Sequence, residues 1–239
     1  MAPANFQAKK GKEQISVIKR NAEKNASWWH SCLNRLYQCL TRNDSAESAD
    51  LIFVMAGRME RKQYGLELYR AGIAPRLVLS VGRFEVSKMC KLDLEDFHEL
   101  VALRERTQAD ERHFFVKVDF SGVHIERAKL QRWNTYGEAL GLRQLLQGER
   151  AGKVMIISTE VHLRRVAITL NKVFHDVPVK FLYCPVPSRL ECLRRDRWWS
   201  RPDDRRFVLS EIMKLAGYVV ILSMPGWAIR RLMRLRRSQ

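Results

Sequence analysis

The sequence lacks the cysteine and histidine motifs that mark metal and redox proteins. Its 239 residues include five cysteines and six histidines, and neither a C-x-x-C pair nor an H-E-x-x-H motif occurs. An odd and dispersed set of cysteines is typical of reduced thiols buried as small apolar side chains. We therefore expect no metal site and no disulfide framework.

The signature loops of common nucleotide-binding proteins and hydrolases are also missing. The motifs G-x-G-x-x-G, G-x-x-x-x-G-K-[ST] and G-x-S-x-G do not occur in the chain. Their absence excludes a standard dinucleotide fingerprint, a P-loop and a nucleophile elbow. Any ligand site has to be argued from the placement of single residues.

No apolar run is long enough to cross a bilayer. The first 25 residues are basic and polar, so we expect no cleaved signal peptide. The longest apolar stretch, from about Leu215 to Ile229, is interrupted by Ser223, Pro225 and Gly226, whereas a spanning helix needs about 20 apolar residues. We therefore expect a cytoplasmic protein, attached at most as a peripheral protein to the inner face of the plasma membrane.

Positive charge is abundant and concentrated toward the two ends of the chain. The formal net charge is +17, with +4 in residues 1–48, +7 in residues 190–239 and five arginines in the last ten residues. Basic ends of this kind suit an anionic membrane surface, and a merely solvated tail is the alternative. Because no recognition motif accompanies the charge, we expect no specific nucleic-acid partner.

Short apolar runs alternate with segments of helical spacing along most of the chain. The runs predict strands over residues 50–56, 76–81, 113–120, 154–158 and 177–183. The helical spacing predicts helices over residues 26–40, 59–71, 92–108, 135–146 and 163–174, and a last one from about residue 206. This order predicts an α/β fold, a three-layer Rossmann-like domain with a mostly parallel five-stranded sheet.

The same patterns predict three parts of the chain. Residues 1–48 form a basic N-terminal extension with an amphipathic helix, whose aromatic face we expect to pack on the core. Residues 49–220 form the α/β domain, and residues 221–239 form a basic C-terminal tail.

The predicted strand ends carry residues suited to binding a ligand. In an open parallel sheet, ligands bind at the carboxyl ends of the strands, where helix N-termini favour anions. Small residues, hydroxyls, arginines and one histidine follow these ends. We expect the site to comprise Gly57, Arg61, Ser80, Gly82, Asn134, Thr135, Glu138, Ser158, Thr159, His162 and Arg165.

These residues carry distinct predicted roles. Gly57 and Gly82 allow backbone amides to approach a ligand closely, and Arg61 and Arg165 would pair with a phosphate or carboxylate. His162 and Arg165 are the predicted catalytic residues, with His162 as the general acid–base because imidazole titrates near neutral pH. The other residues are expected to bind the ligand.

Structural alternatives stay open for several of these residues. Gly57 and Gly82 could serve only as turn residues. Thr135 and Glu138 fit the T-x-x-E capping box, which would occupy both side chains at the start of a helix. His162 could be a structural histidine at a strand-to-helix junction.

The order of these motifs resembles the YdcF-like family, which shares the SanA and ElyC domain. That pattern begins with an aspartate-led strand, a glycine, an Arg-led helix and Gly-x-Ala-Pro, here Asp50–Val54, Gly57, Arg61 and Gly72–Pro75. It continues with a strand ending in Ser and Gly, an Asn-Thr element and a Thr before His-x-x-Arg, here Ser80, Gly82, Asn134, Thr135, Thr159, His162 and Arg165. The similarity covers roughly residues 50–185.

The resemblance implies a Rossmann-like domain with an anion-accepting pocket and an association with the cell envelope and peptidoglycan. One branch of the family is described as binding S-adenosylmethionine, which makes that molecule the candidate cofactor. No reaction is implied, so whether the chain is an enzyme stays open. We expect an enzyme or ligand-binding protein acting on an anionic small molecule or a lipid-linked phosphate. The alternative is a non-catalytic S-adenosylmethionine- or nucleotide-binding module at the membrane surface.

Overall fold

A computed structural model of the protein describes residues 28–44, 46–92, 97–128, 135–147, 151–191, 193–226 and 228–229. Of the predicted site, Asn134 lies outside the described residues, as do most of the basic N-terminal extension and the end of the basic tail.

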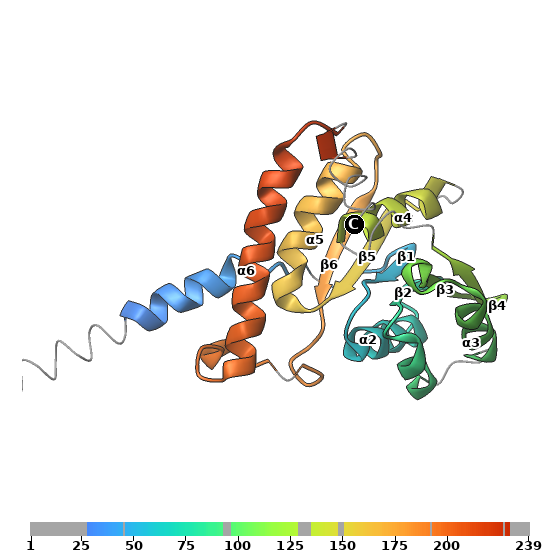
Figure 1. Ribbon diagram of the computed structural model, residues 1–239, viewed down its shortest axis with the longest axis horizontal. Helices are drawn as coiled ribbons and strands as arrows, with labels where there is room; N and C mark the ends of the chain where they lie inside the picture. The colour runs from blue at the N-terminus through green and yellow to red at the C-terminus, as the bar shows by residue number, and fades with distance from the viewer. Residues whose placement is uncertain are drawn as a thin grey trace, which may run out of the picture.

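The core of the fold is a six-stranded mixed sheet (Figure 1). Its strands are β1 (Leu51–Val54), β2 (Leu77–Gly82), β3 (His113–Asp119), β4 (Gly122–Arg127), β5 (Lys153–Ser158) and β6 (Lys180–Pro185). The spatial order is β4-β3-β2-β1-β5-β6; β2, β1, β5 and β6 run parallel, and β3 and β4 pair antiparallel at one edge. The predicted α/β class is confirmed, but the prediction of a five-stranded, mostly parallel sheet is wrong.

The strand that sequence reasoning missed is β4. It is an edge strand with a largely exposed surface, and Val123 and Ile125 are its only partly buried apolar residues. A tight hairpin joins it to β3, where the amide and hydroxyl of Ser121 donate hydrogen bonds to Asp119 Oδ1 at 2.8 and 2.5 Å. Gly122 has a φ of +119°, which favours glycine. The Ser-Gly dipeptide before alternating residues was the available signal.

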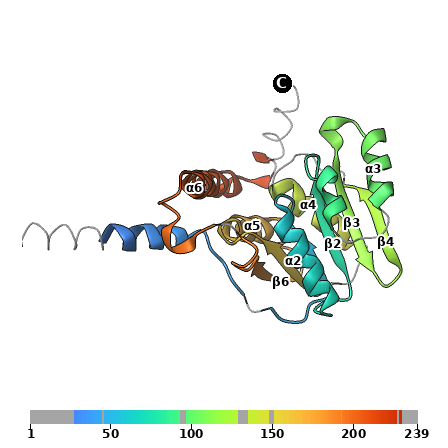
Figure 2. The ribbon, with the colours of Figure 1, turned by 90° about the horizontal axis from the view of Figure 1, so that it is seen from below.

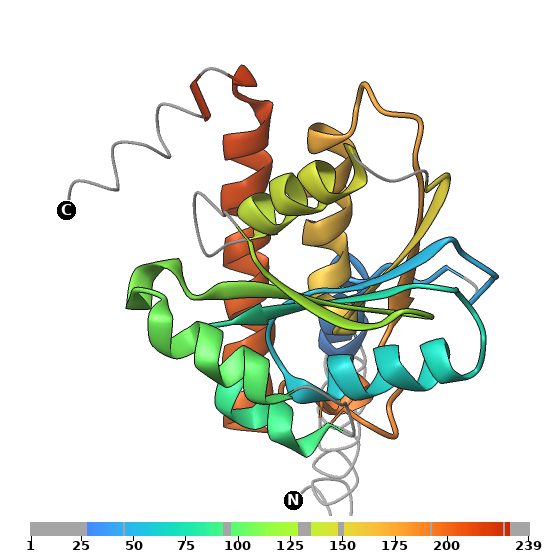
Figure 3. The same cartoon turned by 90° about the vertical axis from the view of Figure 1, so that its right-hand side faces the viewer.

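Helices cover both faces of the sheet, which confirms the predicted three layers (Figure 3). Alternate residues of β1 point to opposite faces. Leu51 and Phe53 join the core under α4 (Thr135–Gln147) and α5 (Glu160–Val173). Ile52 and Val54 join the core over α2 (Met59–Arg70), η1 (Val86–Lys91) and α3 (Phe97–Arg106).

A further helix, α6 (Pro202–Ser223), packs on the outer side of α5 (Figure 2). It follows the short helix η3 (Arg195–Arg197), whereas η2 (Ala109–Glu111) precedes β3. Residues 28–38 are helical, and their end nearest the domain packs against α6 and Trp198 through the buried Tyr37. Trp28 and Trp29 remain 59% exposed, so the predicted packing of this helix on the core holds only for its second half. No helix in the described segments is long and apolar enough to span a membrane.

The topology brings several loops to one edge of the sheet. The chain leaves β1 toward α2 on one face and leaves the adjacent β5 toward α5 on the other. Such a switch point opens a crevice beyond the carboxyl ends of the two strands. Gly57 after β1 and Thr159 after β5 both lie at this edge.

Two helical glycines test how closely the layers pack. A Cβ on Gly65 of α2 would overlap Cγ2 of Val54 in β1, whereas one on Gly217 of α6 would meet nothing within 4 Å. Gly65→Ala should therefore lower the free energy of unfolding by about 1–3 kcal/mol. Gly217→Ala should raise it by about 1 kcal/mol, because alanine is the better helix former. Urea denaturation measures both changes, and a shift of the same sign in the two variants would contradict the packing.

Candidate functional site

A cavity of about 540 Å³ lies at the switch-point edge of the sheet. It is bounded by the ends of β1 and β2, the first turns of α4 and α5, and one face of α6. Six of the predicted site residues line it, namely Gly57, Gly82, Thr135, Glu138, His162 and Arg165. The structure brings these six residues together at one edge of the sheet.

Four other predicted residues lie behind the cavity wall. Arg61, Ser80, Ser158 and Thr159 are all buried and do not line the cavity. Each of them donates or accepts a hydrogen bond that holds a lining residue or a neighbouring loop. Their geometry differs from the predicted direct contact with ligand.

Arg61 ties the loop after β1 to the end of β5. Its Nη1 donates to the carbonyl oxygen of Ala56 at 2.6 Å, and its Nη2 donates to Thr159 Oγ1 at 2.9 Å. Gly57 sits against this guanidinium with a φ of +129°, and a Cβ there would lie 3.0 Å from Arg61 Nη1. Both the backbone conformation and the close approach therefore require glycine at this position.

Two carboxylates accept hydrogen bonds from backbone amides of the same loop. Glu138 Oε1 accepts from the amide of Ala56 at 2.8 Å, and Glu85 Oε1 accepts from the amide of Gly57 at 2.7 Å. Glu85 also forms an ion pair with Lys62, whose side chain is fully buried. Burial lowers the pKa of Lys62, and the charge of Glu85 opposes that shift. The Gly57 amide, which was predicted to approach a ligand, is thus bound by Glu85 of the protein itself.

Two hydrogen bonds of Glu138 reach from α4 to the sheet edge, and the first is the bond from the Ala56 amide. Its Oε1 also accepts from Ser80 Oγ at 2.6 Å. The hydroxyl of Ser80 has a single proton, so at the 2.7 Å contact between the two residues His113 Nε2 must be the donor. The pKa of His113 is lowered to about 4, mainly by burial; the charge of Glu85 opposes the shift, and the charge of Lys62 adds to it. A neutral imidazole thus supports Ser80, which supports Glu138.

His162 is held between two hydroxyls. Its Nδ1 lies 2.7 Å from Ser158 Oγ, and its Nε2 lies 3.2 Å from Thr135 Oγ1. Burial lowers the pKa of His162 well below its ordinary value, and the charges of Arg165, Arg61 and Lys214 add to the shift. The near-neutral pKa on which its predicted acid–base role rested is therefore not present in the folded protein. Its catalytic role stays a prediction.

Arg165 joins three helices at the cavity. Its Nη1 donates to Thr135 Oγ1 of α4, and its Nε and Nη2 donate to Glu211 Oε2 of α6 at 3.2 and 2.9 Å. Lys214 Nζ donates to the other oxygen of Glu211 at 2.9 Å. The guanidinium also lies over the ring of Tyr218, 5.1 Å from its centre. Arg165 and Lys214 thus share one carboxylate and keep a net positive charge at the wall.

Sequence reasoning missed several lining residues. They are Ala56, Arg83, Phe84, Glu85, His113, Lys214 and Tyr218. Glu211, Lys214 and Tyr218 recur at helical spacing on one face of α6, which was the available signal. That spacing did not reveal which element the face would contact.

The site offers no evident metal centre within the part of the chain that the structure describes. No group of three or more His, Cys, Asp or Glu side chains there could hold a metal ion.

No protein-family model, curated protein or solved structure matches the chain. Function therefore has to be inferred from the geometry of the cavity.

The buried histidine His113 makes stability depend on pH. An unfolded histidine gains a proton below about pH 6.5, but folded His113 stays neutral down to about pH 4. Its contribution is present above pH 6.5 and is lost as the pH falls toward 4, by about 1.4 kcal/mol per pH unit. In His113→Gln, the glutamine amide can still donate a hydrogen bond to Ser80. The free energy of unfolding of this variant should therefore fall less steeply than that of the wild type as the pH is lowered, by about 1.4 kcal/mol per pH unit.

Urea denaturation between pH 6.5 and 4.5 measures the difference between the two proteins. Burial raises the pKa of Glu191 to about 7, so this carboxyl group stabilises the folded protein as the pH falls. The effect is the same in the wild type and in His113→Gln, and it cancels when the two are compared. The exposed His98 is the control, and His98→Gln should keep the wild-type slope. Parallel profiles for wild type and His113→Gln would contradict a neutral buried imidazole.

Proposed function

We propose that the cavity binds a small molecule through an anionic group, with a phosphate as the best match. The observation that carries this proposal is Arg165, a buried guanidinium positioned by Glu211 and Thr135 at the cavity wall. Lys214 and Arg83 line the same cavity. Guanidinium and ammonium groups bind phosphate oxygens through charge-assisted hydrogen bonds.

The first turns of α4 and α5 support an anion at the same place. Thr135 is the first residue of α4, and His162 lies in the first turn of α5; both line the cavity. The helix dipole makes such N-termini favourable for negative charge. The position beyond the carboxyl ends of β1 and β5 is also where open α/β sheets bind ligands.

The cavity suits an enzyme or binding protein that acts on an anionic small molecule or a lipid-linked phosphate. The YdcF-like resemblance supports a role of this protein in the cell envelope. Nucleotides and S-adenosylmethionine are the alternative ligands. Both carry an aromatic base, and Phe84 and Tyr218 offer rings at the cavity wall.

A binding screen tests the proposed site. The probes are inorganic phosphate, AMP, ATP, farnesyl phosphate and S-adenosylmethionine, measured by thermal shift and then by calorimetry. A probe present at about 100 times its dissociation constant should add about 2.7 kcal/mol of stability. Arg165→Gln should weaken binding of the positive probe roughly 10- to 100-fold, because a hydrogen bond to a charged group is lost.

Arg189 supplies the matched control. It is an exposed arginine that pairs with Glu67 and does not line the cavity. Arg189→Gln should bind every probe as the wild type does. Equal weakening in the two variants would show attraction to general surface charge and would contradict the site.

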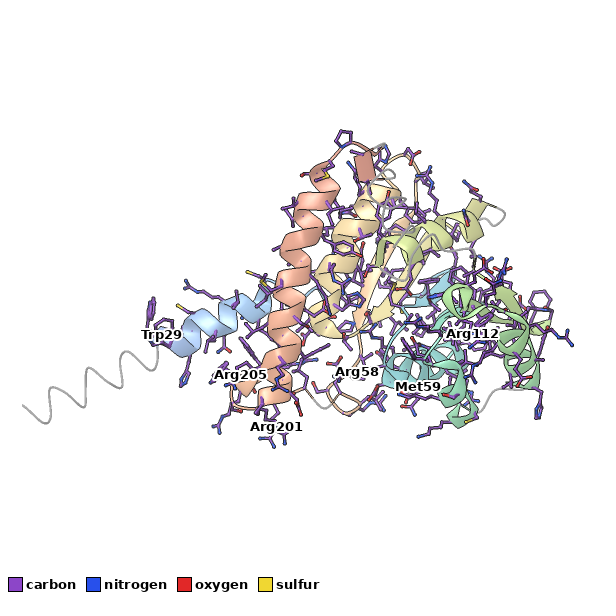
Figure 4. The ribbon with its side chains drawn as sticks, viewed as in Figure 1. Trp29, Arg58, Met59, Arg112, Arg201 and Arg205 are labelled. Carbon is purple, nitrogen blue, oxygen red and sulfur yellow. The ribbon has the colours of Figure 1, made fainter. Side chains whose placement is uncertain are left out.

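We also propose that the outer face of α6 attaches the protein to an anionic membrane surface. Leu209, Met213 and Val220 recur along that face, and the last two are 73% and 60% exposed. The exposed Arg201 and Arg205 lie at the N-terminal end of α6, and Trp29 lies at the end of the neighbouring helix (Figure 4). Apolar side chains, tryptophan and arginine together are typical of helices that lie in a membrane interface.

Sedimentation with vesicles tests the attachment. Vesicles of phosphatidylcholine with about one third phosphatidylglycerol should carry down the full chain, and high salt should weaken the effect. A Met213→Glu and Val220→Glu double variant should bind at least about tenfold more weakly, because both side chains lose apolar burial.

Phe120, which is 98% exposed at the β3–β4 hairpin, supplies the control. Phe120→Glu should sediment as the wild type does. Unchanged binding of the double variant, or its conversion from a dimer to a monomer without vesicles, would contradict the membrane assignment.

A further inference from the structure

We infer that the ligand carries a hydrogen-bond donor, an ammonium or hydroxyl group, two or three bonds away from its phosphate. The inference rests on the proposed anion site and names the second group that the same cavity recognises. It comes from Glu138, an acidic residue in a cavity whose other features favour an anion.

Within the part of the chain that the structure describes, the hydrogen bonds of Glu138 involve one of its two carboxylate oxygens. Oε1 accepts two hydrogen bonds, from the Ala56 amide and from Ser80 Oγ. Oε2 accepts no hydrogen bond from any residue that the structure describes, although the side chain is 94% buried and lines the cavity. A donor on the ligand would form a charge-assisted hydrogen bond with this oxygen.

The other cavity carboxylate is fully engaged. Glu85 gives one oxygen to the amide of Gly57 and the other to the ammonium of Lys62. Glu138 is therefore the acidic group that a ligand can reach without breaking an ion pair.

The spacing along α4 sets the distance between the two ligand groups. Thr135, which accepts from Arg165 at the anion site, and Glu138 are three residues apart on one helix. Side chains with this spacing are neighbours, with about 5–6 Å between their Cβ atoms. The phosphate and the donor must then be close, as in a phosphomonoester with a short amino or hydroxy arm.

Three closely related phosphomonoesters test the inference by calorimetry. Ethyl phosphate carries the anion alone, 2-hydroxyethyl phosphate adds a hydroxyl, and 2-aminoethyl phosphate adds an ammonium. At least one of the two substituted probes should bind the wild type about tenfold or more tightly than ethyl phosphate. Tighter binding by the amino compound names an amine as the ligand group, and tighter binding by the hydroxy compound names an alcohol.

Glu138→Gln should remove the preference, measured as the ratio of the affinity of each substituted probe to that of ethyl phosphate. The amide oxygen of glutamine can still accept from Ala56 and Ser80, so the loop should keep its place. Arg165→Gln should weaken all three probes alike. A preference that survives Glu138→Gln would overturn the inference.

If the Glu138 variant does not fold, the affinities of the wild-type protein for 2-aminoethyl phosphate and phosphocholine test the same hydrogen bond. If the amino compound is the preferred probe, phosphocholine should bind several-fold more weakly than it does, because phosphocholine has the same positive charge but no N–H donor. Equal affinity of the two would overturn the hydrogen bond to Glu138. Three equal affinities that depend on Arg165 would overturn this inference and keep the anion site. No binding of any phosphate probe would overturn the anion site itself.

Discussion

Two adjacent cations buried in α2, Arg61 and Lys62, set the arrangement of the whole sheet edge. Neither side chain can be placed in the interior without a partner, because an unpaired buried charge is strongly destabilising. Lys62 forms an ion pair with Glu85 in the turn after β2. Arg61 donates hydrogen bonds to the Ala56 carbonyl after β1 and to Thr159 after β5. Loops that follow three different strands are thereby held at fixed positions around one point.

From that point, hydrogen bonds extend outward to the cavity. Ser80 and the Ala56 amide hold Glu138, while Ser158 holds His162. On the far side, Glu211 of α6 orients Arg165. The result is a cavity with a carboxylate near the sheet and cations near α6. A ligand with one anionic and one donating group would complement both sides.

The sequence allowed the sheet edge to be predicted but not the supporting contacts. Apolar runs ending in Gly57, Ser80 and Ser158 marked strand ends, and the rule for parallel sheets brought them together. The edge strand β4 was not predicted, because most of its residues are exposed and few of them are apolar. The roles of Glu138 and His162 depended on partners 27 or more residues away in the chain, apart from Ser158. Periodicity cannot reveal such partners, nor the shift in the pKa of His162 that burial causes.

The central claim is that an oxyanion binds between α4, α5 and α6, and a tungstate-soaked crystal tests it most directly. Tungstate resembles phosphate, and its anomalous scattering locates the ion without ambiguity. The account predicts an ion within hydrogen-bonding distance of the Arg165 guanidinium and Thr135, the groups that meet at the cavity wall. Tungstate bound only to exposed arginines such as Arg201, with an empty cavity, would contradict it.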